Sequence, residues 1–326
     1  MLKVSSAPHM SSPVKTSDLM RDVIIALMPA AVVAVAFFGV GALKVILTSV
    51  AGCVLCEYLI TRYLLKIPPT VGDNSAIITG LLLAFNLPSS MPVWMILCGC
   101  AMAIGVAKMC FGGLGKNIFN PALVGRVFLF ISFPVAMTHW PQPRWLDFWN
   151  VDMQTSATTL GIIKHLDAQT SATALSGNLP DYWQMFVGYT GGSLGEVSAL
   201  ALLLGLLYML YRRVITWHIP FYYIATVFMI TGILWLKTGD LRYEPVTHLL
   251  SGGLMLGAVF MATDYVTSPM SKKGQVIFAV GCGVLTVVIR LWSAYPEGVS
   301  FAILIMNAFV PLIDKYCHPR VFGTKR

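Results

Sequence analysis

The sequence predicts an all-α polytopic membrane protein of about ten transmembrane helices, arranged as two inverted five-helix repeats with broken helices. Of the 326 residues, 57% are hydrophobic and only 11% are charged, whereas soluble domains have about 25% charged residues. The apolar runs are continuous, which argues against the alternating strands of a membrane β-barrel. This composition excludes a soluble enzyme, a disordered chain and a secreted disulfide-stapled module.

The elements follow from the apolar runs in order, since a spanning helix needs roughly 20 mostly apolar residues. The expected membrane segments are 23–40, 43–61, 75–87, 93–109, 121–137, 194–211, 217–236, 249–264, 276–292 and 299–313. They divide the chain into a cytoplasmic N-terminal segment (1–22), a first membrane repeat (23–138), an extracytoplasmic loop (139–192), a second membrane repeat (193–314) and a cytoplasmic C-terminal tail (315–326). The N-terminal segment is polar and does not resemble a cleaved signal peptide.

The distribution of lysine and arginine orients these segments. With the N-terminus inside and ten crossings, fifteen of the 22 basic residues lie on the inner side, six lie outside and Arg126 falls within a segment. The positive-inside rule therefore places both termini on the cytoplasmic side of the membrane. The same rule explains the net charge of +8 without a nucleic-acid partner.

The third segment of each half is short and interrupted. Segment 75–87 follows Gly72-Asp73-Asn74, and segment 249–264 contains Ser251-Gly252-Gly253. Because each half has an odd number of segments, the halves would be inverted, and broken helices at matching positions are typical of a midplane site. The alternative is that any two glycine-bearing helices look alike.

Polar residues within or at the ends of the apolar runs are candidates for an ion path or a cofactor site, because they are costly in lipid. The alternative is a structural hydrogen bond or helix cap. These residues are Asp73, Asn74, Asn120, Arg126, Asp264 and Asn307. Asn120-Pro121 opens a helix after a glycine-rich stretch, but that stretch alone is a weak phosphate signal.

The outside loop holds one heptapeptide pattern twice. Asp152-Met153-Gln154-Thr155-Ser156-Ala157-Thr158 returns 15 residues later as Asp167-Ala168-Gln169-Thr170-Ser171-Ala172-Thr173. A Ser/Thr-rich loop with aspartate turn residues is the plain alternative. The histidines have no metal-ligand spacing, no nucleophile motif is present, and Cys53-x-x-Cys56 fits either small buried residues or a redox pair. We therefore expect no metal and no catalytic triad.

With these motifs, nearly the whole chain resembles the RnfD family of Rnf complex subunits and, more distantly, NqrB of the sodium-pumping NADH:quinone reductase. The strongest matches are Gly72-Asp73-Asn74-Ser75-Ala76, Gly112-Gly113-Leu114-Gly115-Lys116-Asn117, Phe119-Asn120-Pro121-Ala122, Gly191-Gly192-Ser193-Leu194-Gly195-Glu196, His248-Leu249-Leu250-Ser251-Gly252 and Tyr295-Pro296-Glu297-Gly298-Val299. The resemblance implies a covalent FMN, bound through a phosphoester to a threonine of the outside loop.

The family pattern maps most simply onto Thr158, with Lys164 shortly after, although Thr159 replaces the usual proline. Thr173 is the alternative FMN site. Small neighbours such as Ser156 and Ala157 suit a flavin transferase, while Thr155 can hold the turn and Asp152 can cap it. The NqrB resemblance further implies a non-covalent riboflavin or second flavin, for which Asn120 and Asp264 are candidates.

The resemblance implies a translocase subunit that relays electrons between ferredoxin and NAD⁺ and couples them to Na⁺ or H⁺ translocation, without turnover on its own. Its partners would be the flavin, Fe–S and membrane subunits of the Rnf complex, a flavin transferase and membrane lipid. The inverted repeat equally fits a secondary transporter or channel with no redox role. A scaffold role is the third possibility.

Overall fold

The computed structural model describes residues 15–68, 70–143, 145, 158–165, 180–196, 198–293, 295 and 297–317. The regular elements within these ranges are α-, 3-10 and π-helices. Among the described residues, five helices are long and apolar enough to cross a membrane, and three shorter apolar helices accompany them. The expected all-helical fold is thereby confirmed for the described residues, and its apolar helices agree with a membrane protein. Ten crossings and the inverted repeat stay predictions.

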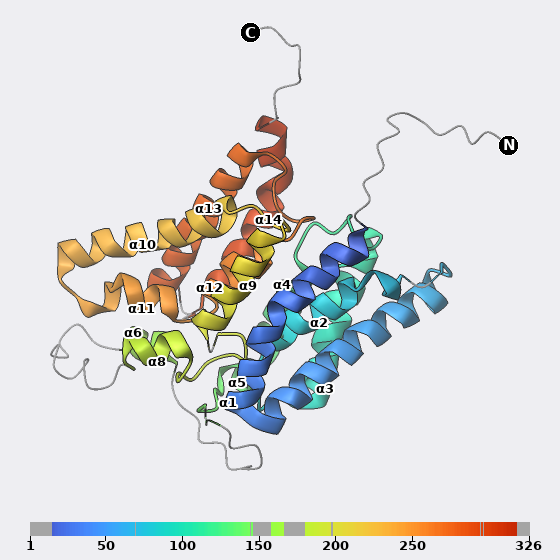
Figure 1. Ribbon diagram of the computed structural model, residues 1–326, viewed down its shortest axis with the longest axis horizontal. Coiled ribbons are helices and arrows are strands. Elements are labelled where there is room, and N and C mark those ends of the chain that lie inside the picture. Colours follow the sequence, from blue (N-terminus) through green and yellow to red (C-terminus); the bar gives the residue numbers. More distant parts are fainter. Residues whose placement is uncertain are drawn as a thin grey trace, which may run out of the picture.

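The first helix, α1 (Thr16–Leu59), contains both of the first two expected segments. It is interrupted at Gly39, where φ is 57° and ψ is −139°, a backbone conformation that side-chain-bearing residues rarely adopt. The chain reverses there, and the second arm of α1 runs back toward the end from which the first arm came (Figure 1). A π-helical turn, η1 (Ile60–Leu64), extends this second arm.

The rest of the first half contains several short helices. After η2 (Val71–Asp73), α2 (Ser75–Phe85) has 11 residues and is almost fully buried, so at 1.5 Å per residue it is far shorter than the roughly 30 Å of a bilayer core. Next come α3 (Val93–Ala101), the π-helix η3 (Met102–Val106) and η4 (Met109–Phe111).

The expected segment 121–137 is two helices rather than one. Helix α4 (Pro121–Ser132) ends where Phe133 adopts φ −132° and ψ 59°, and α5 (Pro134–Thr138) begins at the next residue. The reason is Pro134, since a residue that precedes proline is sterically disfavoured in the helical region. The continuous apolar run concealed this break.

Two short helices, α6 (Thr159–His165) and α8 (Tyr182–Val187), lie between the halves. The expected segment 194–211 becomes helical only at α9 (Ala199–Tyr211), where the Ser198 hydroxyl caps the amide of Ala201. Before it, the backbone amide of Gly195 donates to the carbonyl of Phe85 at the end of α2. This hydrogen bond therefore joins the stretch before α9 to the first half of the chain.

The second half continues with α10 (His218–Thr238), η5 (Leu241–Tyr243), α11 (Pro245–Leu250), α12 (Leu254–Leu256), η6 (Gly257–Met261), α13 (Lys272–Trp292) and α14 (Val299–Tyr316). The break expected at Ser251-Gly252-Gly253 is present between α11 and α12. In Figure 1 the blue-to-green helices and the yellow-to-red helices form two groups side by side. Their buried apolar side chains form one continuous core.

Candidate functional site

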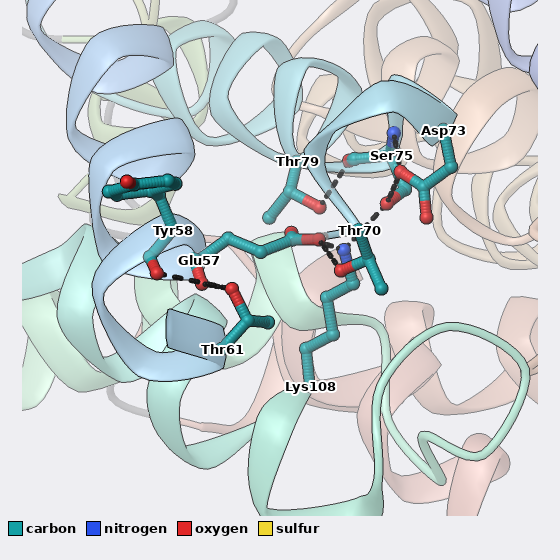
Figure 2. Close-up of polar contacts among 8 residues, drawn as sticks. All are labelled: Glu57, Tyr58, Thr61, Thr70, Asp73, Ser75, Thr79 and Lys108. Atoms are coloured by element: carbon teal, nitrogen blue, oxygen red, sulfur yellow. Dashed lines mark hydrogen bonds and ion pairs between the residues drawn. The ribbon is translucent and has the colours of Figure 1, made fainter. Parts of the chain in front are cut away.

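A buried ion pair joins three elements of the first half (Figure 2). Lys108, in the turn after η3, donates from Nζ to Oε2 of Glu57 on α1 at 2.5 Å and to Oγ of Ser75 on α2 at 2.6 Å. The Glu57 side chain is 0% exposed and that of Lys108 is 2% exposed. The remaining Glu57 oxygen accepts from Thr70 at 2.7 Å, and Ser75 donates to Asp73 at 2.5 Å. Each charge thus has an opposite charge and a hydroxyl as partners.

A cavity of about 80 Å³ lies next to this ion pair, because Ser75 and Lys108 also line it. Asn120 and Asp264, predicted as candidates from opposite halves of the sequence, both line the cavity. Its polar wall further contains Thr79, Asn117 and Thr263. The volume exceeds the roughly 10–15 Å³ that one water molecule needs, so the cavity can hold water or the polar edge of a ligand.

Asn120 links the two halves of the protein. Its Oδ1 caps α4 by accepting from the amides of Ala122 and Leu123, and its Nδ2 donates to the carbonyl of Met261 in η6 at 3.2 Å. The Asn307 amide accepts from the backbone amide of Asn120 at 3.2 Å and donates to the Thr267 carbonyl at 3.1 Å. The cap interpretation of Asn120 is therefore correct, and it does not exclude a ligand role.

A second charged cluster surrounds Arg126 on α4. Its guanidinium forms a short ion pair with Glu297 and lies 3.6 Å from Oε1 of Glu196. The same side chain donates to Asn86 at 2.7 Å and to Ser300 at 2.9 Å. All three charged side chains are 5–10% exposed. Arg126 therefore connects the first half with the stretch before α9 and with the start of α14.

Thr158 stands at the start of α6. Its backbone carbonyl accepts from the Ile162 amide at 2.9 Å, and its Oγ1 accepts from the Gly161 amide at 3.1 Å. The threonine is half-buried, and its hydroxyl proton is not used by this cap. The other proposed loop residues, Asp152, Thr155, Ser156, Ala157 and Thr173, lie outside the residues that the structure describes.

The inward face of α6 closes a pocket of about 90 Å³, which we call the Arg290 pocket. It is lined by Leu160, Ile163, Lys164, Arg242, Tyr243, His248, Arg290 and Leu291. Burial lowers the pKa of Lys164, whose ammonium group donates to the Ser293 carbonyl. The pocket therefore brings three basic side chains, Arg242, His248 and Arg290, from three other elements to Lys164 of α6, the helix that follows Thr158.

Sequence reasoning found Asn120, Arg126 and Asp264 but missed the roles of Glu57, Lys108, Glu196, Glu297 and Arg290. A charge within an apolar run was the available signal, and Glu57 and Arg290 satisfy it in segments 43–61 and 276–292. Lys108 and Arg290 were instead counted only for orientation. Cys53 and Cys56 are free thiols, and no group of three potential metal ligands occurs among the described residues.

The chain is similar to known proteins over nearly its whole length. The profile of the NQR2, RnfD, RnfE family matches residues 3–323. The D subunit of the proton-translocating ferredoxin:NAD(+) oxidoreductase complex of Clostridium ljungdahlii is 46% identical, over 99% of this chain and 96% of that protein. The D subunit of the Na(+)-translocating complex of Acetobacterium woodii is 44% identical over 100% and 96%. The D subunit of the ion-translocating oxidoreductase complex of Escherichia coli O81 is 36% identical over 100% and 99%.

Proposed function

Because this chain belongs to the NQR2, RnfD, RnfE family, we propose that it is a membrane subunit of an ion-translocating ferredoxin:NAD⁺ oxidoreductase (Rnf) complex in the bacterial inner membrane. It relays electrons through FMN bound covalently to Thr158 and couples their passage to ion translocation. The chain works only with the flavin, Fe–S and membrane subunits of that complex, and a flavin transferase matures it. The relatives named for H⁺ and for Na⁺ are 46% and 44% identical, so similarity does not select the ion.

The observation that supports the FMN site is the position of Thr158 at the first turn of α6. Gly161 leaves room beside its hydroxyl, because a Cβ at Gly161 would stand 3.1 Å from the Thr158 Oγ1. The adjoining Arg290 pocket offers cationic donors to an anionic ligand. These residues fit a flavin phosphoester: Thr158 would hold the phosphate, and α6 would fix its direction. The bound flavin supplies the electron transfer, which no side chain here can supply.

The support for a second, non-covalent flavin or riboflavin is that Asn120 and Asp264 line one cavity. Their amide and carboxylate groups suit the polar edge of such a ring. The cavity is smaller than the ~150 Å³ site that holds a benzene ring, so binding requires lining side chains to move. Met20 and Met209 also line the cavity, and methionine adapts readily to irregular space.

In-gel flavin fluorescence tests the covalent site. The denatured full chain, co-expressed with a flavin transferase, is compared with Thr158→Ala, Thr173→Ala and the double variant. Thr158→Asn is the matched control, since asparagine can still cap α6 but cannot form the phosphoester. We expect loss of fluorescence in both Thr158 variants and full labelling in Thr173→Ala. Loss only in Thr173→Ala would move the flavin to the second copy of the motif.

The alternative function is a secondary transporter or channel without a redox role, which the break between α11 and α12 favours. It predicts no fluorescence in the unaltered chain beside a labelled control substrate. It also predicts ion or solute flux when the purified chain alone is placed in liposomes. If fluorescence is present but Thr158 and Thr173 variants keep normal electron flow in the complex, the scaffold role is favoured instead.

A further inference from the structure

The charge of Arg290 is not balanced by an ion pair. Its side chain is 5% exposed at the end of α13. Nη1 donates to the carbonyl of His248 at 2.6 Å and Nη2 to the carbonyl of Ser251 at 3.1 Å, and Nε has no partner. Among the described residues, no carboxylate lies within ion-pair distance of it. The buried cation of the first half, Lys108, has Glu57 at 2.5 Å.

The neighbouring carboxylate is engaged elsewhere. Glu196 lies across the break between α11 and α12, where it faces Arg126 at 3.6 Å. A Cβ on Gly252 would stand 3.1 Å from Nη2 of Arg290, and a Cβ on Gly253 would stand 3.1 Å from Oε1 of Glu196. The two glycines thus separate Arg290 from that carboxylate, and the guanidinium faces the pocket.

The other polar groups of the pocket add positive charge and free hydrogen-bonding capacity. Lys164 reaches it from α6. The His248 ring is 3% exposed; its Nε2 lies 2.9 Å from the Arg242 carbonyl, and its Nδ1 has no partner. Arg242 is neutralised by Asp240 at 2.6 Å. Two cations, Lys164 and Arg290, therefore remain to attract an anion, with two buried nitrogen atoms unpartnered.

The pocket lies within reach of Thr158. Lys164 is six residues further along α6, which corresponds to roughly 9 Å along a helix. The phosphate and five-carbon ribityl chain of FMN separate its ring from the threonine by several bonds. At about 90 Å³, the pocket is too small for a whole tricyclic ring but can receive one edge of it.

We propose that the Arg290 pocket receives the N1–C2 carbonyl edge of the FMN attached to Thr158 and that Arg290 and Lys164 raise the midpoint potential of this flavin. The proposal rests on the covalent FMN proposed above. A flavin that takes up two electrons and one proton carries its negative charge at that edge, and a buried cation stabilises this form over the oxidised ring. The tethered ring is thereby held beside the break between α11 and α12.

The test is a spectroscopic redox titration of the full chain carrying its covalent flavin, with dithionite as the electron donor. Arg290→Gln and Lys164→Gln each remove one of the two cations. In-gel fluorescence measures the labelled fraction of each variant, and the titration follows the flavin of that fraction. We expect a reduction equilibrium weakened roughly tenfold, a shift of about 30 mV to more negative potential for a two-electron couple. Arg290→Lys keeps the charge and should keep most of the potential.

Arg242→Gln combined with Asp240→Asn is the matched control, because this double variant removes a neutral ion pair beside the same pocket and leaves the net charge unchanged. It should shift the potential less than Lys164→Gln does. Lys164 is only partly buried, so its variant keeps the test valid if Arg290→Gln does not fold. Full labelling with an unchanged potential in Lys164→Gln would overturn this inference and leave the covalent site intact. Absence of fluorescence from the unaltered chain would overturn both.

Discussion

Variants of the Glu57–Lys108 ion pair can measure how much stability the protein loses when a buried charge loses its partner. Lys108→Met removes the cation and keeps an apolar stem of similar length, so the Glu57 carboxylate keeps only the Thr70 hydroxyl. Because Glu57 is 0% exposed, water cannot replace the lost ammonium group without opening the fold. Breaking such a pair costs about 3–5 kcal/mol. This corresponds to roughly 10² to 10⁴ in the folded-to-unfolded ratio.

The double variant separates the pair energy from the cost of an orphaned charge. Glu57→Gln alone leaves Lys108 buried beside the Ser75 hydroxyl, and we expect a loss of the same order. Glu57→Gln with Lys108→Met removes both charges, so its loss of stability should be smaller than that of either single variant. The free energies of unfolding come from titrating the protein in mixed micelles with a denaturing detergent while helicity is followed.

The exposed pair of Asp18 and Arg21 provides the control. Its atoms are 3.7 Å apart and its side chains are 48% and 65% exposed, so Asp18→Asn and Arg21→Gln should change stability little. Strictly additive losses in the buried double variant would refute the pairing argument. So would losses in the buried single variants no larger than those of the exposed pair.

Three further perturbations test other parts of the fold. Arg126→Gln leaves two buried carboxylates without their cation and should lower the unfolding free energy by about 3–5 kcal/mol. Arg126→Lys should recover only part of this loss, because the lysine ammonium group cannot bond all four partners of the guanidinium group. Equal stability of the two variants would contradict this reasoning. Gly205→Ala places a methyl group against the carbonyl oxygen of Ala26 on α1 and should lower the unfolding temperature more than Gly105→Ala, whose Cβ makes one ordinary contact, with Ile60 at 3.6 Å. The reverse order would disprove the close approach of α9 to α1. Burial raises the pKa of Asp240, but the hydrogen bonds and the charge of Arg242 lower this pKa overall. The stabilisation by the ionised Asp240 is therefore complete above the unfolded-state pKa of about 3.9, and it is lost as the pH falls through the lower folded-state pKa. Thermal unfolding measured from pH 6 to pH 3 should therefore depend less on pH in Asp240→Asn, and an unchanged pH dependence would count against the pair.

The positions of the long helices could be predicted because membrane insertion depends on a local property. A window of apolar residues locates a segment whatever surrounds it, and α10, α13 and α14 lie within a few residues of the predicted runs. The glycine break at Ser251-Gly252-Gly253 was equally readable, because glycine acts on the backbone locally. The division of segment 121–137 at Phe133 was missed, since hydropathy is continuous across it.

The partners of the charged residues were decided by the tertiary structure. Lys108 and Glu57 are 51 residues apart in the sequence, and Arg126 and Glu297 are 171 apart. Whether such residues meet depends on how each helix is rotated about its axis, and that rotation is set by many weak packing contacts distributed over the core. The hydropathy of a segment does not determine this rotation. The sequence by itself therefore determined that the protein is helical and apolar enough for a membrane, and it identified residues that are costly in lipid. Only the packing of the helices decided that Asn120 and Asp264 share a cavity and that α6 lines the Arg290 pocket.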